Sequence, residues 1–152
     1  MKSMLVIGLG NPLSGDDGIG LCVAERLADD SRLAGFVEIL NGGTDLLRLT
    51  DRLTGRTAVI LVDAILDDSA LGTVSILDDQ TLMGSHRASA HHLSACDTVR
   101  LLKIGNPSLA DTRFTLILIS VDAINSFSAL SPQLTRKLPH IVDQVRQIIA
   151  KA

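Results

Sequence analysis

The sequence predicts an α/β fold: a three-layer α/β/α sandwich built on a mainly parallel, twisted sheet of about five strands. Short apolar runs rich in β-branched residues or leucine recur along the chain and alternate with segments of helical periodicity. The runs lack the alternation of polar and apolar residues of half-exposed strands, which is typical of strands covered on both faces. Strands and helices that alternate in this way favour parallel pairing with right-handed crossovers.

Each expected strand is short and bounded by Gly, Asn, Asp or Thr. Four of them are continuous apolar runs, at residues 4–9, 36–40, 58–62 and 114–121. The fifth, at residues 72–77, has a weaker pattern. We expect it at an edge of the sheet, paired antiparallel with its neighbour.

Helical spacing of apolar residues marks the segments between and after these strands: residues 17–30, 44–53, 94–104 and 131–149. Thr44 is the expected N-cap of the second segment. Ser131 and Pro132 form an N-cap and N1 pair at the start of the last one. Pro139 lies inside that last segment and is expected to kink or restart the helix.

Length and composition bound the class of protein. A chain of 152 residues that is 46% hydrophobic can bury one core, so we expect a single domain over residues 1–152. A net charge of −3 and 2% aromatic residues provide neither the basic face nor the stacking rings of a nucleic-acid binder. No apolar stretch approaches the ~20 residues of a membrane span, and the N-terminal run lacks a signal-peptide cleavage site. We therefore expect a cytoplasmic protein that binds neither nucleic acid nor membrane.

The two cysteines, Cys22 and Cys96, form no CxxC pair. Both fall in helical patterns, so we expect small buried apolar side chains rather than a disulfide or a thiolate zinc site.

A glycine-rich loop with two adjacent acids follows the first strand, and residues 8–20 read GLGNPLSGDDGIG. The opening GxG matches the start of a dinucleotide fingerprint, but Leu13 occupies the third glycine position. Asp16 and Asp17, at the start of the following helix, would repel a phosphate there. A nucleotide-binding oxidoreductase is therefore disfavoured.

The acid pair has two interpretations. In the first, Asp16 is the helix N-cap and Asp17 lies in the first turn, so both are structural. In the second, one carboxylate caps and the other faces a groove at the carboxyl ends of the strands, as a metal ligand or an acid/base group. The glycines favour the second interpretation because they allow close approach. The spacing does not say which acid has which role.

Asp63 directly follows the run at residues 58–62. A carboxylate there either caps a turn or faces the same groove as the acid pair, since an unpaired buried charge is costly. If the first and third strands are neighbours, their carboxyl ends lie only ~5 Å apart. We favour the groove for Asp63.

Three of the four histidines, His86, His91 and His92, fall in one segment before the third helix. One imidazole with two carboxylates would suit a first-row divalent ion. The alternative is that these histidines cap or pack against the helix. His140, in the last helix, is expected at the surface.

In chain order these motifs resemble the hydrogenase maturation endopeptidases, which process the large subunit of nickel–iron hydrogenases. The resemblance rests on GxGNxxxxDDGxG, Gly-Gly-Thr after the second strand, a strand ending Asp-Ala, the segment Ala-His-His-Leu, and Leu-Ser-Pro before the last helix. It extends from Leu5 into the last helix and so spans nearly the whole chain.

The resemblance implies an endopeptidase that removes the C-terminal extension of the large-subunit precursor after nickel insertion. It implies that Asp17, Asp63 and His91 bind the metal, with His91 rather than His92 because one residue separates it from the leucine. The nickel would be supplied by the substrate, with no organic cofactor, and we expect the protein to be a monomer. The metal would be a template, a Lewis acid or a water activator, or a carboxylate would act as general base.

The chain departs from the family pattern in places. Asp17 stands where many members have Glu, and Ala129 replaces a common glycine. Residues 121–125 lack the proline and glutamate that the family often carries there, which leaves open which hydrogenase is served. The alternative function is a non-proteolytic, metal-dependent assembly chaperone or binding module for the same hydrogenase.

Overall fold

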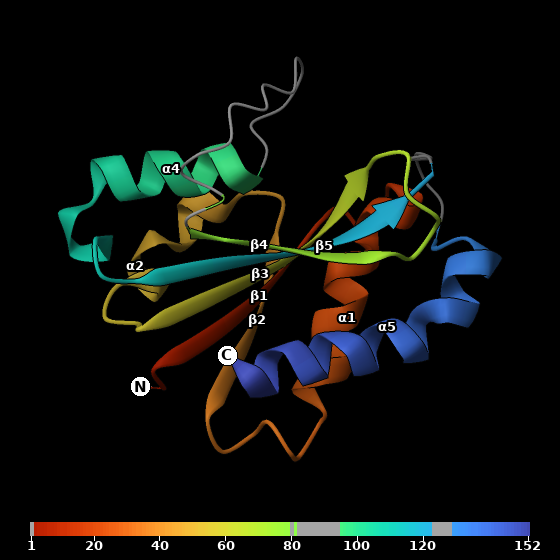
Figure 1. Cartoon of the computed structure of the whole chain (residues 1–152), viewed down its shortest axis with the longest axis horizontal. Helices are drawn as coiled ribbons and strands as arrows, with labels where there is room; N and C mark the ends of the chain where they lie inside the picture. The colour runs from red at the N-terminus through yellow and green to blue at the C-terminus, as the bar shows by residue number, and fades with distance from the viewer. Residues whose placement is uncertain (1, 80, 82–94, 123–128) are drawn as a thin grey trace.

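The computed structural model describes residues 2–79, 81, 95–122 and 129–152. Its centre is a five-stranded sheet of order β2-β1-β3-β5-β4, in which β4 alone runs antiparallel to its neighbour (Figure 1). The strands are β1 (Met4–Leu9), β2 (Val37–Gly43), β3 (Ala58–Leu66), β4 (Val74–Asp78) and β5 (Arg113–Val121). The five predicted strands, the parallel pairing and the antiparallel edge are confirmed.

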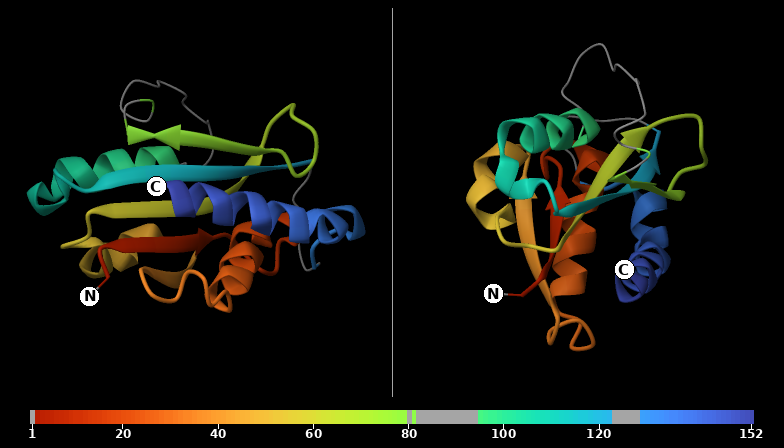
Figure 2. Two further views of the ribbon diagram at one scale, coloured as in Figure 1. Left: turned by 60° about the horizontal axis from the view of Figure 1, so that its bottom comes forward. Right: turned by 60° about the vertical axis from the view of Figure 1, so that its left-hand side comes forward.

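Helices cover both faces of the sheet and give the predicted three layers (Figures 1 and 2). One face carries α1 (Ile19–Ala28) and α5 (Pro132–Lys151), and the other carries α2 (Thr50–Leu53) and α4 (Ala95–Gly105). Short 3-10 helices complete the described elements: η1 (Gly15–Gly18), η2 (Leu46–Leu49) and η3 (Pro107–Leu109). None of the described helices is both long and apolar enough to cross a membrane.

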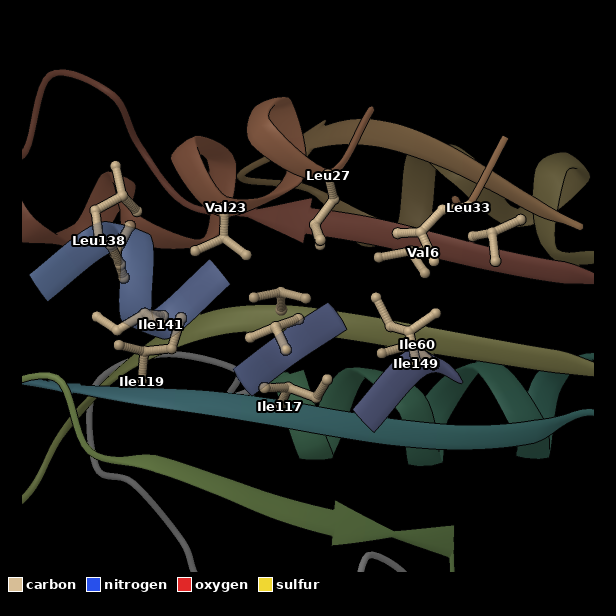
Figure 3. Close-up of a cluster of buried hydrophobic side chains, with 14 of the residues drawn as sticks. Val6, Val23, Leu27, Leu33, Ile60, Ile117, Ile119, Leu138, Ile141 and Ile149 are labelled. Atoms are coloured by element: carbon tan, nitrogen blue, oxygen red, sulfur yellow. The ribbon is translucent and has the colours of Figure 1, made fainter. Parts of the chain in front are cut away.

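Side chains of the central strands alternate between two separate cores. Val6, Ile60 and Ile117 pack with α1 and α5, in the cluster of Figure 3. Their neighbours Leu5 and Val59 pack with α2 and α4 on the opposite face. The buried residues of these strands therefore meet apolar side chains on both faces of the sheet, which explains why their sequences are continuous apolar runs.

Several helix and strand limits differ from the sequence prediction. Thr44 is not an N-cap; Asp45 caps η2 by accepting a hydrogen bond from the Leu47 backbone N at 3.1 Å. The expected helix over residues 44–53 is a 3-10 turn followed by the single turn of α2. Pro139 does not restart the last helix, because α5 is one helix capped by Ser131 as predicted.

The first turn of α1 lies directly against the end of β1 and against β3 at Val62. A methyl group at Gly20 would overlap the carbonyl oxygens of Leu9 and Val62, and one at Gly8 would lie 2.5 Å from the Gly20 carbonyl oxygen. Glycine at these positions lets backbone approach backbone. The approach fixes the loop that precedes α1 beside the carboxyl end of β3.

We predict that Gly20→Ala destabilises the protein, although alanine favours helices, because the added methyl must push α1 away from the strands. Overpacking of this kind costs about 1–3 kcal/mol. Urea denaturation should show the loss. Gly35→Ala is the matched control, since no heavy atom lies within 4 Å of the added methyl, and it should change the free energy of unfolding by less than about 1 kcal/mol. Equal midpoints for the two variants would contradict the packing argument.

Candidate active site

A pocket of about 160 Å³ lies at the carboxyl ends of β1, β2 and β3. The loop at residues 10–18, called the first loop below, forms one wall, and the start of α4 forms another. The lining residues are Leu9, Gly10, Asp17, Gly43, Thr44, Leu46, Asp63, Ala95 and Thr98. The pocket is at the rim where parallel α/β sheets bind their ligands.

Asp63 enters this pocket because the sheet is stepped. Pairing of β3 with β1 stops at Val62, whereas pairing with β5 continues to Leu66. Asp63 is thus the first residue of β3 with no β1 partner, and its Oδ1 accepts a hydrogen bond from the Ala64 backbone N at 2.8 Å. The prediction that the strand ends before Asp63 is wrong, since the carboxylate lies within a strand that runs four residues past Val62.

Asp17 reaches the pocket from the first loop. Its Oδ2 accepts a hydrogen bond from the Asn11 backbone N at 2.9 Å. The loop also closes on itself through the bond from Asp17 N to the Ser14 carbonyl oxygen, at 3.2 Å. Gly10 has a φ of +142° and a side chain there would overlap the Asp17 carbonyl oxygen. Glycine at position 10 therefore brings the acid-bearing turn against the end of β1.

Asp16 takes no part in lining the pocket. It is buried, and its carboxylate accepts two hydrogen bonds from Ser131 at the start of α5. The N-cap of α1 is Gly18, so the interpretation of Asp16 as the cap of that helix is wrong. The structure assigns the two adjacent acids to different surroundings, with Asp17 in the pocket and Asp16 bonded to α5.

Burial and a neighbouring carboxylate set the pKa of Asp63. Burial raises the pKa of Asp63 from its ordinary 3.8 to about 7; the Ala64 N–H opposes this rise and the Asp17 carboxylate adds to it. A carboxyl group that changes charge near neutral pH suits acid/base work or the exchange of a proton for a cation.

The other nucleophile candidates fit less well. Cys22 and Cys96 are free, half-buried thiols on α1 and α4, and burial raises the pKa of each. Both thiols therefore stay protonated at neutral pH and are poor nucleophiles. The two cysteines were expected to be buried apolar side chains, and each is half-buried and unpaired; the carboxylates are the better candidates.

The structure brings Asp17 and Asp63 together, as the sequence predicts. The third predicted ligand, His91, lies outside the described residues, as do His86 and His92. Among the residues that are described, no group of three His, Cys, Asp or Glu side chains could hold a metal ion. His140 is exposed, as expected.

Sequence reasoning missed the contribution of α4 to the pocket. Ala95 and Thr98 are three residues apart, and so lie on one side of the first turn of α4, facing the pocket. Thr98 is 9% exposed. A buried hydroxyl in an otherwise apolar helix face is the signal that could have identified it.

Comparison with known proteins agrees with the resemblance found in the sequence. A family model described as hydrogenase maturation protease matches residues 21–151. The chain belongs to the hydrogenase maturation protease family. It is therefore a hydrolase, which confirms the expected endopeptidase class and sets aside the non-proteolytic chaperone or binding module.

Individual members of the family match over most of the chain. The hydrogenase 2 maturation protease of Escherichia coli (strain K12) is 29% identical over 145 residues, which are 93% of this chain and 87% of that protein. The structure of the hydrogenase maturating endopeptidase HybD from E. coli has a TM-score of 0.79 at 28% identity, covering 99% of this chain and 93% of the other. The NiFe hydrogenase maturation protease HybD from Thermococcus kodakarensis has a TM-score of 0.75 at 28% identity, covering 97% and 99%.

The pKa of Asp63 predicts how the stability of this maturation protease depends on pH without added metal. The folded protein holds the Asp63 proton more tightly than the unfolded chain, so stability present at low pH is lost as pH rises from about 4 through about 7. Asparagine does not ionise, so Asp63→Asn should lose less stability over this range and should be more stable than wild type at pH 8.

Melting temperatures at pH 5 and pH 8 measure this difference. Asp68→Asn removes an exposed carboxylate from the loop after β3 and is the matched control; its pH dependence should follow that of wild type. A pH dependence of Asp63→Asn equal to that of Asp68→Asn would contradict the prediction.

Proposed function

We propose that this protease removes the C-terminal extension of a nickel–iron hydrogenase large-subunit precursor after nickel insertion, and that it recognises the nickel carried by that precursor. One observation supports the recognition step above all: Asp17 and Asp63, from the first loop and from β3, line the same pocket. The name of the T. kodakarensis relative, a NiFe hydrogenase maturation protease, supports a nickel–iron hydrogenase as the source of the substrate.

The proposed ligands to the substrate's nickel are Asp17, Asp63 and His91. Two carboxylates and one neutral imidazole form a mixed oxygen and nitrogen set that suits a borderline divalent ion. His91 precedes Ala95 by four residues, and Ala95 lines the pocket. Four residues of chain span at most about 14 Å, so the covalent chain permits His91 to be the third ligand.

Charge in the pocket gives a physical basis for choosing nickel-loaded precursor. With no cation present, the pKa of Asp63 is about 7, first because burial penalises the charged form and then because the Asp17 carboxylate lies in the same pocket. A divalent ion bound by the two acids would displace the Asp63 proton and stabilise the ionised carboxylate. Precursor that lacks nickel offers no such compensation, so the protein would bind it less well.

In this proposal the protein holds no metal of its own. The residues of the pocket orient the precursor by its nickel, so that the scissile peptide bond lies next to the two carboxylates. We expect the reaction to take place in the cytoplasm with the protease as a monomer, and both expectations stay predictions.

Substitution of either carboxylate tests the proposal. Asp17→Asn and Asp63→Asn should each lower kcat/KM for nickel-loaded precursor by more than the about 10–100-fold typical of outer partners of a metal ligand. Cleavage is followed by the mass of the large subunit. Asp68→Asn, with its exposed side chain, should cleave at the wild-type rate. Full activity of either pocket variant would show that the assignment is wrong.

The recognition step is tested with the wild-type protein. Nickel-loaded and nickel-free precursor are offered at equal concentration, and we expect cleavage of the loaded form alone. Equal rates for the two forms would remove nickel recognition from the proposal while leaving the protease activity intact.

A further inference from the structure

Asp16 links the first loop to a distant part of the chain. The Ser131 backbone N donates to Asp16 Oδ1 at 2.7 Å, and Ser131 Oγ donates to Oδ2 at 2.9 Å. The same Oγ accepts a hydrogen bond from the Leu134 backbone N at 3.3 Å and so caps α5. Asp16 is 8% exposed. The first loop is thus joined to the start of α5 by charge-assisted bonds that are largely shielded from water.

The 3-10 turn that carries Asp16 and Asp17 links the directions in which their two side chains point. Asp16 and Asp17 are consecutive residues of η1, a 3-10 helix with three residues per turn. Successive side chains of such a helix point roughly 120° apart. A rotation of η1 about its own axis that moved Asp16 away from Ser131 would therefore turn Asp17 away from the pocket as well.

Hydrogen bonds inside the first loop do not set the orientation of the loop relative to β3. The bonds of Asp17 to Asn11 N and to the Ser14 carbonyl oxygen join parts of the loop that move together. The Gly10 N–H bonds to the Gly43 carbonyl oxygen at 2.8 Å and holds the beginning of the loop to β2. The bonds to Ser131 hold η1 itself to a separate element of the fold.

We propose that Asp16 is a positioning residue: through Ser131 it fixes the rotation of η1 at which the Asp17 carboxylate faces Asp63. The inference rests on the proposed function, since it takes Asp17 to bind the nickel of the substrate. It gives the adjacent acids separate tasks and makes the start of α5 part of the support of the active site.

The full-length protein tests this proposal, with Ni²⁺ alone as the binding probe and nickel-loaded precursor as the substrate. Asp16→Asn and Ser131→Ala should each weaken Ni²⁺ binding about 10-fold or more, as expected when the support of a metal ligand is lost. The value of kcat/KM for the precursor should fall by a similar factor. The double variant should bind Ni²⁺ as tightly as whichever single variant binds it less tightly, because both changes break the same contact.

Two further variants separate positioning from general stability. Ser131→Thr keeps the hydroxyl and the backbone donor and should restore Ni²⁺ affinity to near wild type. Asp45→Asn is the matched control, since Asp45 caps η2 beside the same pocket. It should keep wild-type Ni²⁺ affinity even if its melting temperature falls as far as that of Asp16→Asn.

The positioning role is overturned if folded Asp16→Asn and Ser131→Ala keep the Ni²⁺ affinity and the kcat/KM of wild type. If only their melting temperatures fall, the contact between Asp16 and Ser131 is purely structural. Asp17→Asn separates this failure from that of the proposed function. If Asp17→Asn also keeps both properties, the proposed function itself is wrong. If it loses both while Asp16→Asn keeps them, only the positioning inference is overturned.

Discussion

The site depends on how closely the backbone of the first loop and of α1 approaches the ends of the strands. Gly20 lies against the Val62 carbonyl oxygen, and Gly10 lies against that of Asp17. A Cβ at either glycine would separate the two layers of backbone. Since Asp63 follows Val62 on β3, this approach brings an acid from a loop to the same pocket as an acid from a strand.

Much of the fold is readable from the sequence because its strands are buried on both faces, which leaves continuous apolar runs and makes the sheet predictable. The first and last residues of the helices and strands are harder to predict from the sequence. Strand β3 continues past Asp63 because β5 supplies a partner there, and that is information about a neighbour rather than about the local sequence. The capping of η2 by Asp45 instead of Thr44 depends on which of two adjacent side chains reaches the Leu47 N–H, and composition does not distinguish them.

The candidate site was also predictable from the sequence only in part. That an acid of the first loop and Asp63 share a pocket followed from parallel strands that end at one rim. Which of Asp16 and Asp17 faces the pocket did not follow, because both are acids in one turn and only Ser131, far along the chain, separates their roles. Thr98 was missed because its hydroxyl marks a polar position in an apolar helix face but does not say that tertiary packing brings this face to the pocket.

The stepped rim of the sheet means that the two carboxylates of the pocket are supported in different ways. Asp63 belongs to a strand with partners on one side along its whole length and on both sides up to Val62, and amides in such central strands exchange with solvent only on global opening. Asp17 belongs to a loop, whose amides generally open at a lower free energy. Asp17 is therefore the carboxylate whose position needs a further tie to the fold, and the bonds between Asp16 and Ser131 supply it.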